Sequence, residues 1–254
     1  MILAHRLDGP ADASVLVLSG GLGTTTALWD EQLPALARHF RVLRHDLPGH
    51  GESPLPEGPV SIERIGHTVI ALLDELGVER AAFCGLSLGG MVGMWLGVNA
   101  PDRVERLVLA CTGASLGTPE LYASRAAKVR AEGTAVVLAG ARERWFTPAF
   151  RDSPAASRIV AELAEIPAEG YAACCEAVGA FDFHAQLGRI AQPTLVLYGE
   201  EDTMTPERVV AALTQGIPNT RQVSIPRAAH LANVEQPEAF TAAVLSHLEE
   251  RAAA

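Results

Sequence analysis

Gly85-Leu86-Ser87-Leu88-Gly89-Gly90 is the stretch of sequence that decides the fold. The mostly apolar residues 80–84 precede it and indicate a strand, and residues 91–96 follow it as a helix-like run. A strand, a tight turn and a helix in this order place Ser87 at the apex of a strained turn that exposes its hydroxyl. The flanking glycines permit the turn because a side chain at either place would crowd the serine. The stretch has the Gly-x-Ser-x-Gly signature of a nucleophile elbow.

The composition is that of a packed globular protein. A chain of 254 residues with 48% hydrophobic and 20% charged residues fits one large domain, or one domain with an inserted cap. The formal net charge of −10 argues against nucleic acid and anionic membrane surfaces as partners. It also gives an anionic substrate no long-range attraction, which local arginines would have to supply. The sequence leaves the oligomeric state open.

The cysteines and the first residues favour a cytoplasmic protein. The four cysteines form no C-x-x-C pair, and the adjacent Cys174 and Cys175 make a poor disulfide framework. We expect all four to be reduced and buried. Residues 1–6 lack the pattern of a secretory signal, and no run of about 18 apolar residues predicts a membrane span.

Short apolar runs alternate with helical stretches along the chain. Several runs are apolar on both faces, as in the centre of a parallel sheet covered by helices. The alternation predicts an α/β fold with right-handed crossovers, and residues 2–8 are expected to add an antiparallel edge strand. The other expected strands are residues 14–18, 41–44, 81–84, 106–110, 194–198 and 220–225.

Residues 111–192 interrupt the alternation and show no convincing strand. Four helices inserted between two strands predict a cap over the edge of the sheet. We therefore predict a core of residues 1–111 and 192–254 and a helical cap of residues 112–191. The expected cap helices are residues 120–132, 134–145, 153–165 and 169–181.

Three further helices have recognisable boundaries. Ser61 is expected to cap a helix over residues 62–76. Thr205 is expected to cap another helix, with Pro206 at its first position. The last helix is expected over residues 237–249.

A serine hydroxyl needs a base to remove its proton before it attacks a carbonyl. In folds with this elbow, the acid and the histidine follow the serine along the chain. His230 directly follows the last predicted strand, where a loop can bring it over the sheet edge, and it is the expected base. His184 is expected to be structural or on the surface, and His247, in a polar helix, is expected to face solvent.

The loop after residues 194–198 offers the acid. Glu200, Glu201 and Asp202 all lie in it, and a carboxylate there can accept a hydrogen bond from the imidazole and stabilise its protonated form. Asp46 precedes the serine and is expected to fix its own loop. His50, in that same loop, is expected to be structural, with a place at the edge of the pocket as the alternative.

An oxyanion hole needs two backbone N–H groups aimed at the tetrahedral oxygen. Leu88, directly after the serine, is one expected donor. The loop after residues 14–18 supplies the other, and its spacing to Trp29 indicates Leu22. Many hydrolases have His-Gly where this chain has Gly20-Gly21, but a backbone donor does not depend on the side chain beside it.

With these residues assembled, the chain resembles the α/β-hydrolases over essentially its whole length and, more narrowly, the 3-oxoadipate enol-lactonases of aromatic catabolism. The similar strings include residues 85–93 (GLSLGGMVG), 106–112 (RLVLACT) and 229–237 (AHLANVEQP). Two more lie in the predicted cap, residues 143–148 (ERWFTP) and 170–177 (GYAACCEA), and these are the more specific because caps vary with substrate. Gly20-Gly21 departs from the Asn-Ser that the resemblance implies, which bears on the shape of the oxyanion hole.

The resemblance implies an α/β-hydrolase fold: a mostly parallel twisted sheet with helices on both faces and an inserted helical cap. Its Gly-x-x-Asp pattern matches Asp202, so that Ser87, Asp202 and His230 form the implied triad. The implied reaction opens the lactone ring of 3-oxoadipate enol-lactone through an acyl-enzyme and gives 3-oxoadipate. No cofactor is implied, and the histidines are too scattered to predict a metal site.

The implied substrate also carries a carboxylate, which should meet a cation or a set of N–H donors. Arg125, Arg142 and Arg144 in the predicted cap are candidates, with Arg144 first. Trp145 is a candidate for the pocket wall, with packing in the core as its alternative.

Two other functions are compatible with the same residues. The triad also serves carboxylesterases, C–C bond hydrolases and perhydrolases that act on small carbonyl substrates, and a fold does not settle a function. A non-catalytic binding module with the hydrolase shape is the second, against which an intact serine, acid and histidine argue. The expected partner of either enzyme is a small-molecule lactone or ester.

Overall fold

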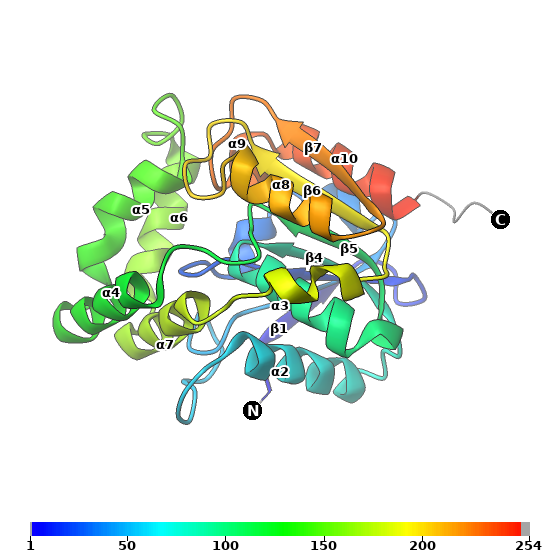
Figure 1. Cartoon of the computed structure of the whole chain (residues 1–254), viewed down its shortest axis with the longest axis horizontal. Coiled ribbons are helices and arrows are strands. Elements are labelled where there is room, and N and C mark those ends of the chain that lie inside the picture. Colours follow the sequence, from blue (N-terminus) through cyan, green and yellow to red (C-terminus); the bar gives the residue numbers. More distant parts are fainter. Residues whose placement is uncertain (1, 250–254) are drawn as a thin grey trace.

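A computed structural model describes residues 2–249, and a seven-stranded sheet forms its centre (Figure 1). The strand order is β1-β3-β2-β4-β5-β6-β7, with β1 antiparallel to β3 and every other neighbouring pair parallel. The expected α/β sheet with an antiparallel edge strand is thereby confirmed. The strands are β1 His5–Asp8, β2 Val15–Ser19, β3 Arg41–His45, β4 Ala81–Leu86, β5 Val104–Ala110, β6 Thr194–Gly199 and β7 Thr220–Ile225.

Helices cover both faces of this sheet, which explains why its central strands are buried and mostly apolar. Every residue of β2, β4 and β6 is buried, whereas the edge strand β7 is only partly buried. Figure 1 shows α8 and α10 on opposite sides of β6 and β7, which both helices contact. The helices of the sheet layers are α1 Leu33–Leu36, α2 Ile62–Glu75, α3 Leu88–Asn99, α8 Glu207–Gly216, α9 Ala232–Glu235 and α10 Pro237–Glu249.

Four helices lie between β5 and β6, where the sequence predicts them, and we call them the cap helices. The second expected helix is divided, because its first turn is the 3₁₀ helix η3, Thr134–Val137. Figure 1 shows the cap helices gathered on one side of the sheet. They are α4 Pro119–Glu132, α5 Leu138–Trp145, α6 Pro154–Glu165 and α7 Ala168–Gly179. The remaining 3₁₀ helices are η1 Thr26–Trp29, η2 Pro101–Arg103 and η4 His184–Arg189.

Two helix starts differ in how they are capped. The hydroxyl of Ser61 accepts a hydrogen bond from the Arg64 N–H at 3.1 Å, as expected for the cap of α2. The expected cap by Thr205 is wrong, since α8 begins at Glu207 with Pro206 before it and has no side-chain cap. The Thr205 hydroxyl donates a hydrogen bond to the Asp202 carboxylate, three residues earlier in the chain.

The expectation that His247 faces solvent is wrong. Its side chain is buried, with 2% of its surface exposed. Phe240, Val244 and His247 recur at the spacing of one helix face, and α10 turns that face toward β6 and β7. The polar neighbours of His247 in the sequence lie on the other faces of the helix.

The cysteines match expectation. Cys84, Cys111, Cys174 and Cys175 are all free and buried. Among residues 2–249, none of the helices combines the length and hydrophobicity that a membrane span requires.

A buried histidine at the end of β3 predicts how stability depends on pH. Burial lowers the pKa of His45 to about 4, against a smaller effect of its hydrogen bond to the Asp46 carbonyl. The unfolded chain therefore binds a proton that the folded protein excludes as pH falls from about 6.5 toward 4. The stability that the neutral His45 contributes is fully present above about pH 6.5 and is lost as pH falls from there toward 4. The free energy of unfolding falls in that range by at most about 1.4 kcal/mol per pH unit.

We expect His45→Leu, which removes this titration, to lower the pH dependence of the free energy of unfolding between about pH 7 and pH 4.5. Urea unfolding at a series of pH values measures the slope. His184→Gln is the matched control because His184 is exposed, and it should keep the wild-type slope. Equal slopes for wild type and His45→Leu would contradict the prediction.

Candidate active site

Ser87 stands between β4 and α3 in a strained backbone conformation, with φ 55° and ψ −113°. Its N–H donates to the Ala110 carbonyl at 2.8 Å, which ties the turn to β5. A Cβ on Gly85 would lie 2.1 Å from the Gly89 carbonyl oxygen, and one on Gly89 would lie 2.1 Å from that of Ser19. The elbow therefore requires glycine at both places because backbone occupies the space that a side chain would need.

Two backbone N–H groups are available beside Ser87. Leu88 begins α3, and Leu22 lies in the turn after β2, which the Gly89 N–H holds by a 3.0 Å bond to the Gly20 carbonyl. Within the described part of the chain, neither the Leu22 N–H nor the Leu88 N–H has a protein acceptor. A Cβ on Gly21 would come within 3.3 Å of the Ser87 Cβ, so the glycine in this turn leaves the space beside the serine open.

His230 and Asp202 meet in the interior. His230 Nδ1 lies 2.9 Å from Asp202 Oδ2, and the two residues are 2% and 3% exposed. The other carboxylate oxygen accepts the N–H groups of Met204, at 2.7 Å, and Thr205, at 3.1 Å. Burial raises the pKa of Asp202, but the charge and hydrogen bond of His230 and the bonds from Thr205 outweigh it and lower the pKa. The ionised carboxylate accepts from Nδ1–H, which leaves Nε2 of the imidazole as a proton acceptor.

The two competing carboxylates of this loop point elsewhere. Glu200 and Glu201 are both exposed, and Glu200 accepts a hydrogen bond from the Ser224 hydroxyl at 3.0 Å. Of the three acids that the sequence offers, the structure places Asp202 against His230.

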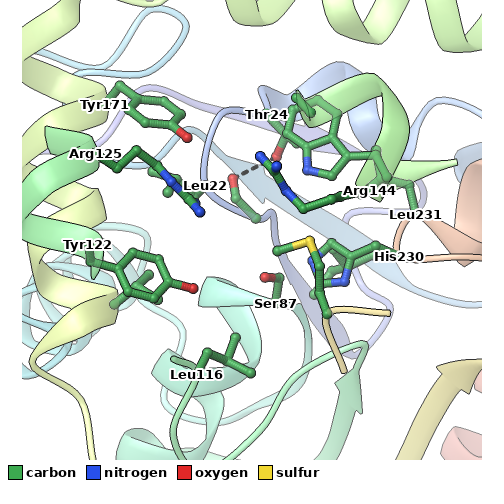
Figure 2. A pocket seen from close by; sticks show the side chains of 16 residues that line it. Leu22, Thr24, Ser87, Leu116, Tyr122, Arg125, Arg144, Tyr171, His230 and Leu231 are labelled. Atoms are coloured by element: carbon green, nitrogen blue, oxygen red, sulfur yellow. Dashed lines mark hydrogen bonds between the residues drawn. The ribbon is translucent and has the colours of Figure 1, made fainter. Parts of the chain in front are cut away.

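A cavity joins these groups to the cap helices (Figure 2). Of the cap residues that the sequence singles out, Arg144, Trp145 and Arg125 line it, and Arg142 does not. Arg142 donates to the Arg151 carbonyl at 2.7 Å. The lining residues also include Leu22, Ser87, Leu116, Tyr122, Tyr171, Met204 and His230.

The cavity carries positive charge that the protein does not neutralise. Arg125 and Arg144 are half-buried, and neither forms an ion pair with a carboxylate of residues 2–249. Arg125 lies over the Tyr122 ring, 5.0 Å from its centroid. Burial, then the charge of Arg125, lowers the pKa of Arg144, and burial raises that of Tyr171 to about 12. Two desolvated cations beside neutral phenols suit an anionic ligand.

Three further residues of this region were not singled out by the sequence, although Tyr171 and Glu235 lie within strings that carry the resemblance. Tyr122 and Tyr171 lie in cap helices 49 residues apart in sequence, and the sequence does not distinguish them from core aromatic residues. Glu235 is a buried carboxylate that accepts the Ala229 N–H at 2.7 Å and the Thr147 hydroxyl at 2.7 Å. It thereby joins the loop of His230 to the segment that follows α5.

The residues expected to be structural or peripheral lie away from the cavity. Asp46 accepts the N–H groups of Thr26, at 2.7 Å, and Glu52, at 3.1 Å, as expected for a residue that fixes its loop. His184 is exposed beside Asp182 at 2.8 Å. No group of three or more His, Cys, Asp or Glu residues in the described chain is placed to hold a metal ion.

Comparisons with known proteins identify the family of the chain. The family model described as "Alpha/beta hydrolase family" matches residues 15–243. Over 244 residues the chain is 40% identical to "3-oxoadipate enol-lactonase 2" of Acinetobacter baylyi, covering 95% of this chain and 91% of the relative. It is 32% identical to the "Putative carbamate hydrolase RutD" of Stutzerimonas stutzeri, covering 94% and 93%.

Solved structures give the same result. A hydrolase from Pseudomonas aeruginosa superposes with a TM-score of 0.94 at 48% identity, over 98% of this chain and 94% of that one. The enol-lactonase from Burkholderia xenovorans superposes with a TM-score of 0.95 at 39% identity, over 98% and 96%. The chain belongs to the alpha/beta hydrolase family.

Proposed function

We propose that the protein is a serine hydrolase that opens the lactone ring of 3-oxoadipate enol-lactone. The observation that carries the substrate is the pair of arginines without ion-pair partners, Arg125 and Arg144, in the same cavity as Ser87. A lactone that bears a carboxylate places one neutral carbonyl and one anion in a single small molecule. The similarity to enol-lactonases supports the same substrate class.

Ser87 is the proposed nucleophile and His230 its base. The imidazole takes the hydroxyl proton at Nε2 because Nδ1–H is already donated to Asp202. The ionised Asp202 stabilises the imidazolium that forms, and the N–H groups of Leu22 and Leu88 stabilise the oxyanion of the tetrahedral intermediate. Collapse of this intermediate breaks the ring C–O bond and expels an enolate, a better leaving group than an alkoxide. The enolate takes the proton from the His230 imidazolium and becomes an enol, which leaves His230 neutral again.

The second half of the reaction releases the product. His230 activates a water molecule against the acyl-enzyme, and the same two N–H groups stabilise the second oxyanion. The freed enol tautomerises to the ketone of 3-oxoadipate. Throughout, Arg144 and Arg125 hold the carboxylate, and Trp145 and the two tyrosines form the wall around the ring.

Substitution of Ser87 tests the proposed nucleophile. We expect Ser87→Ala to lose about a million-fold in kcat, as triad members typically do, and to keep its thermal unfolding temperature within a few degrees. The enol-lactone is followed by its ultraviolet absorbance, and a fluorophosphonate probe should label the wild type alone. An active Ser87→Ala enzyme, or an unlabelled wild type, would contradict a serine mechanism.

Substitutions in the loop after β6 test which of its carboxylates acts with His230. Asp202→Asn keeps the shape of the side chain but no longer stabilises the imidazolium, so we expect kcat to fall about ten-thousandfold. Glu201→Gln is the matched control, since this neighbour is exposed, and its kcat should stay within about twofold of wild type. The assignment of the acid is wrong if the two variants exchange these effects.

Substitutions of the two cavity arginines test the substrate class. We expect Arg144→Gln and Arg125→Gln to lower kcat/KM for the enol-lactone by about ten- to a hundredfold, the effect of one lost charge-assisted hydrogen bond. For p-nitrophenyl acetate, which has no carboxylate, kcat/KM should change little. Arg142→Gln controls for the loss of a cap arginine outside the cavity. Equal losses on both esters, or fast ester hydrolysis without lactone opening, would indicate a general carboxylesterase instead.

A further inference from the structure

His50 lies outside the cavity but forms a hydrogen bond with the turn that contains Leu22. Its side chain is completely buried. Nε2 accepts the Gly23 N–H at 3.1 Å, and Nδ1 lies 3.1 Å from the Pro48 carbonyl oxygen, to which it donates. The imidazole thus has a proton on Nδ1 and a lone pair on Nε2, and burial lowers its pKa to about 4, which favours this neutral form.

The Gly23 N–H belongs to the central peptide group of this turn, the one between Leu22 and Gly23. The Gly21 carbonyl accepts the Thr24 N–H at 3.2 Å and the Thr24 hydroxyl at 2.9 Å, so Leu22 and Gly23 are the two central residues of a β-turn. Gly23 has φ +84°, a value that glycine tolerates at the third position of such a turn. The peptide between Leu22 and Gly23 can rotate in a turn of this kind, and the bond to His50 fixes its plane.

The other side of the His50 loop is held by a cap helix. Gly49 and Gly170 of α7 make backbone contact, since a Cβ on Gly170 would lie 2.2 Å from the Gly49 carbonyl oxygen. The Cys174 thiol, also on α7, donates to the Pro48 carbonyl at 3.5 Å. His50 therefore links the loop that packs against α7 to the turn beside Ser87 through its hydrogen bond with Gly23.

We propose that His50 is a positioning residue for the oxyanion hole: by accepting the Gly23 N–H it holds the turn that presents the Leu22 N–H to the substrate. The inference rests on the proposed function, because it takes the Leu22 N–H as an oxyanion donor. His50 does not contact the substrate. Its effect is confined to the transition state, where the oxyanion exists, so its loss lowers kcat and leaves KM unchanged.

Two substitutions separate the two hydrogen bonds of His50. Asn places its amide near the position of Nδ1, so His50→Asn can keep the bond to Pro48 but cannot reach Gly23. Gln places its amide oxygen near the position of Nε2, so His50→Gln can accept the Gly23 N–H and loses the bond to Pro48. A merely structural histidine would be affected similarly by both changes.

We expect His50→Asn to lower kcat by about ten- to a hundredfold at unchanged KM, less than the full loss of an oxyanion donor, and His50→Gln to restore kcat to within about threefold of wild type. The assay substrates are the enol-lactone and p-nitrophenyl acetate, and thermal unfolding of each variant is measured alongside. Equal kcat for the two variants, a loss that appears in KM, or losses that follow thermal stability would overturn the proposal.

A measurement on the wild type covers the case in which His50→Asn does not fold. Nitrogen NMR of His50 at neutral pH should show a protonated Nδ1 and an unprotonated Nε2, and the reverse tautomer would overturn the proposal. The outcomes also separate the two claims. If fluorophosphonate labels Ser87 but the lactone is not opened, the proposed substrate fails while the His50 comparison still stands on p-nitrophenyl acetate.

Discussion

The backbone contact between the start of α3 and the end of β2 is the constraint on which the site depends. Gly89 lies so close to the Ser19 carbonyl that a Cβ would be 2.1 Å from its oxygen, and its N–H bonds the Gly20 carbonyl. The same contact brings the turn of Leu22 beside the first residue of the helix, Leu88. It also leaves Ser87 at φ 55°. One packing constraint thus sets the strained turn of the serine and places two N–H groups without a protein acceptor beside it, so glycines that look permissive in the sequence fix the geometry of the site.

The sheet could be predicted because its strands are encoded locally. β2, β4 and β6 are buried on both faces, so each is a short apolar run whatever its partner. The two errors arise where tertiary contacts override a local signal. Thr205 was expected to cap α8, but the helix begins only at Glu207, after Pro206, and the Thr205 N–H and hydroxyl both donate to Asp202. His247 has polar neighbours in the chain, but it shares a helix face with residues that pack on the sheet.

The candidate site was predictable where residues directly follow strands and less so elsewhere. Ser87 and His230 follow β4 and β7, and the carboxyl ends of parallel strands meet at one edge of a sheet. Among the three acids after β6, only family resemblance favoured Asp202, because neighbouring residues in the sequence do not determine where a loop side chain points. The tyrosines of α4 and α7 were not predicted to line the cavity, because each alone is indistinguishable from a core residue, even though Tyr171 lies in a string that carries the resemblance.

The charge of the cavity indicates how an anionic substrate is recognised. The chain as a whole carries −10, so its long-range field does not draw anions toward it. The proposed recognition therefore relies on short range, where burial strengthens each electrostatic interaction. Burial and the charge of Arg125 both disfavour the charged form of Arg144, and the carboxylate of the proposed substrate would offset both effects. The residue after Arg144 accepts the Leu231 N–H through its carbonyl at 3.0 Å, directly beside His230. In the proposed function, this backbone hydrogen bond joins the segment of Arg144, the proposed binder of the carboxylate, to the loop of His230, the proposed base.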